Sequence, residues 1–215
     1  MDFLQTKQLI QERRSIRKFQ DKPVDKQDIL DIIDCARYAP SDTNSQTWEF
    51  VVVTNKEKIK EIEDMTWAAL HEKAEEAKEK GLEKPAKLLV RSFGPYATAF
   101  SEAPVLIVCL ATPYESKFKD KIFDPIGFVE EEVWTEEGIK SSCLAAQNLM
   151  LAAHAKGLGT CPMTGPVLLA QDKLREYLNI EGHKEINMVI SLGHPTDQPK
   201  TMPRKPVEEI LTIVE

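Results

Sequence analysis

No apolar run in the chain reaches the length of about 20 residues that a membrane helix needs. The first residues, from Met1 to Lys7, also lack the basic and apolar regions of a secretory signal peptide. We therefore expect a cytoplasmic protein without a membrane partner. Basic residues are outnumbered by acidic ones, 28 against 35, and the net charge is −7. Because nucleic acid repels an acidic protein, a nucleic-acid partner is not expected either.

Cysteine and histidine are scarce, with four of each. Cys35, Cys109, Cys143 and Cys161 form no C-x-x-C pair and lie in apolar stretches, so they are predicted to be buried thiols. The histidines show no metal-ligand spacing, and no metal site is expected. The nine glycines form neither a P-loop nor a G-x-G-x-x-G fingerprint, and G-x-S-x-G does not occur. Hypotheses of a phosphate-loop, Rossmann or hydrolase enzyme thereby lose their main support.

The chain has the size and composition of one soluble globular domain, with 215 residues of which 42% are hydrophobic and 29% charged. Helical periodicity runs through residues 2–11, 25–38, 67–80 and about 136–156. Continuous apolar, β-branched runs at 48–53, 105–110 and 188–192 predict strands of a central sheet that are buried on both faces. The charged helix at 67–80 is interpreted as solvated and without a chemical role.

The region from Thr112 to Glu137 is a long connection with aromatic residues among Lys and Glu. It is either a lid over a functional site or a peripheral helical excursion with its own aromatic cluster. The following helix is apolar on nearly all sides, which predicts that it is buried and makes it the best candidate for a subunit interface. Gly157 is expected to cap its end.

Residues 13–19 (RRSIRKF) place Arg13, Ser15 and Arg17 at every second position. An extended backbone would present them on one side, and a helix would still bring the two arginines to one face. Guanidinium groups bind phosphate through paired charge-assisted hydrogen bonds, so this row suits a phosphate monoester. Taken alone, such a string is more typical of a basic surface turn.

A second segment, residues 40–48 (PSDTNSQTW), changes that interpretation. Together the two segments resemble the paired flavin-binding motifs of the nitroreductase family. Residues 145–159 are similar to the central helix of that family and its turn. Residues 191–195 and 203–206 are similar to its last inner strand and C-terminal phosphate contact. The resemblance thus covers most of the chain, in the same order.

The resemblance implies one FMN-binding domain over residues 1–215 with an α+β fold. In that fold a central, mostly antiparallel sheet is flanked by helices, and two chains form an intertwined homodimer with FMN between them. One subunit would bind FMN through Arg13, Arg14, Ser15 and Arg17, with Arg204 and Lys205 joining Arg13 on the phosphate. The partner would line it with Pro40, Ser41, Asp42 and Asn44. The segment beside the isoalloxazine ring would be Pro162, Met163, Thr164 and Gly165.

The function implied is an NAD(P)H-dependent flavin oxidoreductase. It takes hydride from NADH or NADPH and then, in a ping-pong cycle, reduces an electron-poor acceptor such as a nitroaromatic or a quinone. We expect Arg17 to stabilise the negative charge of the reduced flavin, although a surface arginine often only pairs with a carboxylate. No catalytic acid or base is assigned. Other flavin redox chemistry, such as flavin fragmentation or dehalogenation, stays open, as does a non-catalytic flavin-binding or interaction protein.

The C-terminal arm, residues 195–215, contains four prolines, which favour an extended chain. We expect it to cross to the partner subunit, where residues 210–214 could add a strand to the partner's sheet; a frayed tail is the alternative. Two positions depart from the family pattern, with Thr47 in place of a common proline and Thr164 in place of an acidic residue found in some members. Residues 91–98 fall where relatives contact the flavin pyrimidine edge, but no individual residue can be matched.

Overall fold

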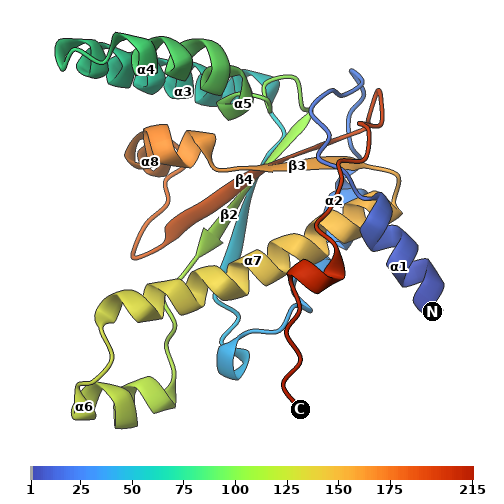
Figure 1. Ribbon diagram of the computed structural model, residues 1–215, viewed down its shortest axis with the longest axis vertical. Helices are drawn as coiled ribbons and strands as arrows, with labels where there is room; N and C mark the ends of the chain where they lie inside the picture. The colour runs from blue at the N-terminus through green and yellow to red at the C-terminus, as the bar shows by residue number, and fades with distance from the viewer. Residues whose placement is uncertain (1) are drawn as a thin grey trace.

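The computed structural model describes residues 2–215, so that Met1 of the predicted domain lies outside the described residues. Over this range four antiparallel strands form one sheet in the order β1-β2-β4-β3. The strands are β1 (Trp48–Val53), β2 (Val105–Ala111), β3 (Gly159–Met163) and β4 (Glu185–Gly193). Helices cover both faces of the sheet (Figure 1). The prediction of an α+β fold with an antiparallel sheet flanked by helices is confirmed.

The side chains of β2 alternate between two hydrophobic cores, one on each face of the sheet. On one face, α2 (Lys26–Ala36) and α7 (Glu131–Ala155) pack against Val105, Ile107 and Cys109. On the other, α3 (Lys56–Glu79) and α8 (Gly165–Tyr177) pack against Leu106, Val108 and Leu110. Because both faces are covered, every position of this strand is apolar and buried.

The remaining helices lie outside these two cores. On the α3 side lie α4 (Glu83–Leu88), a π-helical turn (Leu89–Phe93) and α5 (Gly94–Ala97). The predicted charged helix proves to be the end of α3, which begins at Lys56 because the Asn55 side chain accepts a hydrogen bond of 3.0 Å from the Lys58 backbone. Helix α1 (Phe3–Glu12) buries none of its residues. Among the helices of residues 2–215, none has both the length and the apolarity of a membrane span.

The connection from 112 to 137 forms a helical excursion with its own aromatic cluster, one of the two predicted alternatives. It contains a π-helical turn (Lys119–Phe123) and α6 (Asp124–Ile126) and leads into α7, which begins at Glu131. Tyr114 stacks on Trp134 with ring centroids 5.7 Å apart, and Phe123 meets Phe128 edge-on at 5.7 Å. That residues 112–137 act as a lid over a functional site stays a prediction.

Two burial predictions are wrong. Strand β1 is an edge strand whose middle residues are only half buried, because no strand pairs with its outer side within the described chain. Cys35 and Cys143 are exposed, whereas Cys109 and Cys161 are buried as predicted. The Cys143 thiol lies beside β4, where it accepts a hydrogen bond of 3.3 Å from the Asn187 side-chain amide, yet the residue is exposed, which its apolar neighbours in the sequence did not reveal.

Helix α7 ends as predicted and leads straight into a strand that the sequence analysis missed. Gly157 has a φ of +75°, and its backbone nitrogen donates to the His154 carbonyl at 2.9 Å. The Leu158 nitrogen donates to the Ala153 carbonyl at 2.9 Å, which completes the cap. Strand β3 follows at Gly159. It is short and contains Pro162, a residue that edge strands tolerate.

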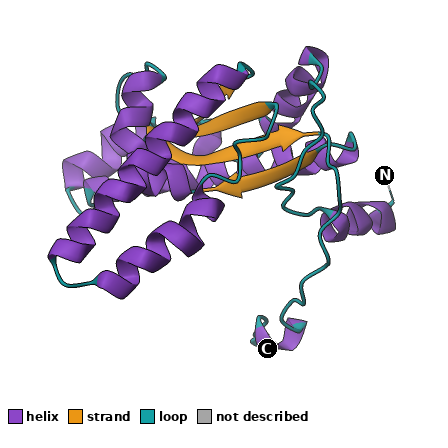
Figure 2. Cartoon of the chain, turned by 90° about the horizontal axis from the view of Figure 1, so that it is seen from above, coloured by secondary structure: helices purple, strands orange, loops and turns teal. Residues whose placement is uncertain are grey.

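The C-terminal arm leaves the body of the chain after β4 (Figure 2). Its only regular element among the described residues is a 3-10 turn, Val207–Glu209, so residues 210–214 form no strand in the isolated chain. The apolar side chains of Ile210, Ile213 and Val214 are 70%, 72% and 91% exposed. Such a segment lacks a packing partner within its own chain.

Gly138 fixes the contact between α7 and the end of β2. A Cβ atom on Gly138 would lie 1.9 Å from the carbonyl oxygen of Thr112. We predict that Gly138→Ala lowers the free energy of unfolding by about 3 kcal/mol, since helix and strand must move apart. The melting temperature should fall by about 6–12 °C in thermal denaturation. Lys140→Ala, an exposed change on the same helix, should cost about 0.5 kcal/mol or less; equal effects of both variants would contradict the explanation.

Candidate functional site

The first motif is extended and pairs with the free edge of β3. The Ile16 nitrogen donates to the Thr160 carbonyl at 2.9 Å, and Ser15 forms a parallel bridge with Thr160. Farther on, Phe19 bridges to Pro195. Ile16 is buried, and Gly159 allows its approach, because a Cβ at 159 would lie 2.7 Å from the Ile16 side chain. The extended alternative of the sequence analysis is therefore the observed one.

Arg13 stands in a cluster of cations. Burial lowers its pKa, and the positive charges of Arg14 and Arg204 lower it further. Its Nη1 atom is buried without a hydrogen-bond partner. Glu12 lines the adjoining cavity, but it is not among the groups that shift the pKa of Arg13. An unsatisfied buried donor amid like charges is costly unless an anion completes it, and a phosphate supplies both the charge and the acceptors.

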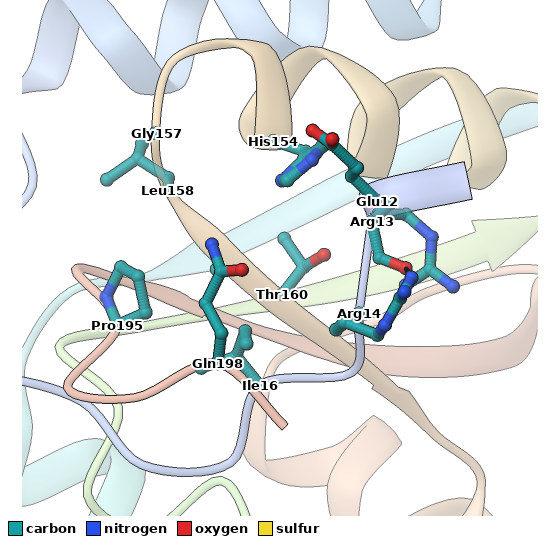
Figure 3. A pocket seen from close by; sticks show the side chains of 11 residues that line it. Glu12, Arg13, Arg14, Ile16, His154, Gly157, Leu158, Thr160, Pro195 and Gln198 are labelled. Atoms are coloured by element: carbon teal, nitrogen blue, oxygen red, sulfur yellow. Dashed lines mark hydrogen bonds between the residues drawn. The ribbon is translucent and has the colours of Figure 1, made fainter. Parts of the chain in front are cut away.

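A small cavity of about 70 Å³ adjoins this cluster. Figure 3 shows Gln198 of the C-terminal arm over the middle of the cavity, with Arg13 and Arg14 on one side of it and Pro195 on the other. The Arg14 guanidinium donates to the Gln11 carbonyl at 2.5 Å and to the Thr201 hydroxyl. Arg14 therefore ties the arm to the end of α1. Lys205, on the same arm, is exposed.

Arg17 points to a different place, a pocket of about 210 Å³ at the end of β3. The structure brings it together here with the whole predicted ring segment, Pro162, Met163, Thr164 and Gly165. Cys161 precedes this segment in β3. Burial raises the pKa of its thiol, while Arg17, Ser15 and Arg13 lower that pKa. Within the described chain Arg17 forms no ion pair, so the carboxylate-paired alternative is not what the structure contains.

The second motif lies at the opposite edge of the sheet. It precedes β1, whereas the first motif follows the edge of β3, and β2 and β4 separate the two strands. Pro40, Asp42 and Asn44 are exposed in a turn around Asp42–Asn44, and Ser41 accepts a hydrogen bond of 2.9 Å from the Gln46 nitrogen. The two motifs of one chain therefore do not meet, and we call them the first and second half-sites of the predicted flavin site.

The loop of the second motif is held in an unfavourable backbone conformation. Thr43, Asn44 and Gln46 have positive φ angles of 45°, 60° and 52°. Left-handed backbone is uncommon for residues other than glycine, and for a β-branched threonine it is an outlier. The loop is fastened by a 3.1 Å contact between the hydroxyls of Thr43 and Tyr114. Strain of this kind gathers at functional sites, where the surrounding structure imposes it.

Sequence reasoning missed three contributors to the site. Phe93 and Tyr96 line the pocket of Arg17, although residues 91–98 were assigned only as a region. Thr47, which departs from the family pattern, donates its hydroxyl to the Gly138 carbonyl at 3.3 Å and so joins the second motif to α7. For Phe93 and Tyr96, the available signal was the presence of two aromatic residues within residues 91–98.

Comparisons with known proteins agree with this geometry. The profile of the nitroreductase family matches residues 10–194. A nitrobenzene nitroreductase of Ectopseudomonas oleovorans is 32% identical over 86% of this chain and 84% of its own length. A chloronitrobenzene nitroreductase of Comamonas testosteroni is 29% identical over 96% of this chain and 95% of its own. A solved BluB-like flavoprotein from Clostridium difficile 630 has a TM-score of 0.85 at 28% identity and covers 100% of both chains.

The chain belongs to the nitroreductase family, because the family profile spans most of its length. This confirms the resemblance drawn from the two motifs and, with it, the prediction of an oxidoreductase of that family. The individual roles of the site residues stay predictions.

The strain in the second motif predicts an unusual stabilising mutation. Glycine adopts positive φ without the steric cost that Gln46 bears, so Gln46→Gly should raise the free energy of unfolding by about 1 kcal/mol. Gln46→Ala is the matched control, because it removes the same polar atoms and keeps the strain. Chemical denaturation measures both. A Gln46→Gly protein no more stable than Gln46→Ala would show that the loop is relaxed.

Proposed function

We propose that this nitroreductase-family protein is an FMN-dependent oxidoreductase that works as a homodimer. It would take hydride from NADH or NADPH and pass electrons to an electron-poor acceptor such as a nitroaromatic or a quinone. The observation that carries the proposal is the separation of the two half-sites at opposite edges of one sheet. Each half-site is incomplete in its own chain, and a two-fold pair would join the first of one chain to the second of the other.

The first half-site fits the phosphate end of FMN. Arg13 offers a buried donor without a partner, and Arg204 lies near enough to lower the pKa of Arg13. Lys205 follows Arg204 on the exposed arm and would complete the cationic cluster. A dianionic phosphate would replace the repulsion among these groups by attraction. The solved relative described as a flavoprotein, 28% identical over the whole chain, supports a flavin as the ligand.

The pocket at the end of β3 fits the ring end. Bound FMN would supply the ability to accept a hydride and to release its electrons to a second molecule. Arg17 would contribute a positive charge to this pocket, which favours electron uptake because no carboxylate pairs with the guanidinium in the described chain. The curated relatives that are named for nitrobenzene and chloronitrobenzene reduction support a nitroaromatic acceptor.

The second half-site suggests what the excursion from 112 to 137 does. Tyr114, at its start, contacts Thr43 of the strained loop. If the loop lines the FMN of the partner subunit, the excursion would serve as a lid over the partner's pocket and not over its own. Exposed Phe118 and Phe128 would then offer apolar surface to an acceptor. The exposed arm, residues 195–215, would pack across the partner.

The identity of the cofactor is the first test. The purified protein should be yellow, and heat should release FMN and neither FAD nor riboflavin. Arg13→Ala should weaken FMN binding by about tenfold to a hundredfold, the loss expected for charge-assisted hydrogen bonds. Fluorescence quenching on titration of the apoprotein measures it. Arg37→Ala, an exposed arginine paired with Asp34, is the control and should leave the affinity unchanged. Released FAD, or unaltered affinity of the Arg13 variant, would contradict the phosphate assignment.

The chemistry at Arg17 is the second test. Arg17→Ala, saturated with FMN, should be reduced by NADH or NADPH about 30- to 1000-fold more slowly, as expected for loss of about 2–4 kcal/mol of preorganised electrostatic stabilisation. Its flavin midpoint potential should fall. Lys18→Ala removes the adjacent exposed cation and should change neither quantity. Anaerobic stopped-flow mixing measures the rates at equal flavin occupancy. A normal potential and rate in Arg17→Ala would mean that the ring's charge is stabilised elsewhere.

A further inference from the structure

We propose that Tyr96 is a positioning residue for Arg17, holding its guanidinium in the pocket at the end of β3. The inference rests on the proposed function, since the role of Arg17 does. The Tyr96 ring lies under the guanidinium, with the carbon Cζ of Arg17 5.8 Å from the ring centroid. A cation over the face of an aromatic ring at this distance is attracted by the ring's quadrupole.

No ion pair or side-chain hydrogen bond in the described chain fixes the position of the Arg17 guanidinium. Among residues 2–215 its guanidinium has no ion pair and no hydrogen bond to a side chain, and the residue is exposed. An exposed arginine without partners samples many rotamers, and holding it in one costs entropy. The Tyr96 ring offers a preferred position for a side chain that otherwise has none.

The backbone that carries Tyr96 is fixed on two sides by glycine contacts. On one side, a Cβ at Gly94 would lie 2.4 Å from the Trp67 ring of α3. On the other, a Cβ at Gly165 would lie 2.5 Å from Ala97. The Thr98 hydroxyl also donates to the Gly94 carbonyl at 3.0 Å. Helix α5 is therefore clamped between α3 and the start of α8, and Tyr96 is presented from a rigid turn.

A second observation explains why Arg17 needs to be held. Arg17 and Tyr96 line both the pocket at β3 and a neighbouring groove of about 440 Å³. That groove also contains Glu63 and Glu102. Without the ring, Arg17 would be free to turn toward these carboxylates, which would neutralise the charge intended for the pocket. The ring itself is not part of the core, since Tyr96 is 65% exposed.

The experiment compares Tyr96→Leu with Tyr96→Phe. Tyr96→Leu removes the aromatic face and should slow reduction of FMN-loaded enzyme by NADH about two- to fivefold, the range expected for an exposed cation–aromatic contact. It should also lower the flavin midpoint potential and leave FMN affinity and melting temperature unchanged. Tyr96→Phe keeps the face and should behave as wild type. In the FMN-free protein, the Arg17 side-chain NMR resonances should lose their ring-current shift in Tyr96→Leu and keep it in Tyr96→Phe.

The double variant Arg17→Ala/Tyr96→Leu distinguishes a Tyr96 that acts through Arg17 from a Tyr96 that contacts the acceptor directly. If Tyr96 acts through Arg17, adding Tyr96→Leu to Arg17→Ala should have no further effect on the reduction rate. Additive effects, or a changed KM for the acceptor with an unchanged potential, would overturn the proposal and mark Tyr96 as a direct acceptor contact. A ring-current shift lost in Tyr96→Leu, together with a normal reduction rate in Arg17→Ala, would support the contact while refuting the proposed function of Arg17.

Discussion

The pairing of β2 with β4 in the middle of the sheet is the constraint on which the site depends. Both strands are covered by helices, and their side chains supply both hydrophobic cores. This leaves β1 and β3 as the two edges, and each edge carries one of the two motifs predicted to bind a flavin. Two half-sites fixed to opposite edges of a rigid sheet cannot come together by movement within one chain. We propose a dimer on this geometry, since a second copy would bring the missing half.

Each half-site is left in an unfavourable state that a ligand or a partner would relieve. The first gathers Arg13, Arg14 and Arg204, and the charges of the other two lower the pKa of Arg13. The second holds a loop with left-handed threonine, asparagine and glutamine. The exposed apolar residues of the C-terminal arm belong to the same pattern. Clustered positive charge, backbone strain and exposed apolar surface all cost stability, and on this ground we propose that a ligand or a partner completes the chain at these surfaces.

The sequence predicted an element correctly where a local pattern was enough to determine it. Continuous apolar runs predicted β1, β2 and the inner part of β4, and Gly157 predicted the end of α7. Arg17 and the segment from Pro162 to Gly165 were expected at one place, and the structure brings them together. Prediction failed where the outcome depends on tertiary neighbours. Strand β3 has a proline and too few β-branched residues to be recognised, and it forms because β4 pairs with it. Cys143 is exposed although its thiol lies beside Asn187 of β4, and its apolar neighbours in the sequence do not reveal this exposure.

The central claim, that one flavin site needs residues from two subunits, is tested most directly by mixing subunits. Arg13→Ala damages the first half-site, and Asn44→Gly damages the second while allowing the positive φ at this position. Each variant alone should lose tight FMN binding at both sites of its dimer. After the two are unfolded and refolded together, mixed dimers contain one site with both halves intact. Tight binding should therefore return at about one site in four if subunits assort at random. A mixture that binds FMN no better than either variant alone would contradict the shared site.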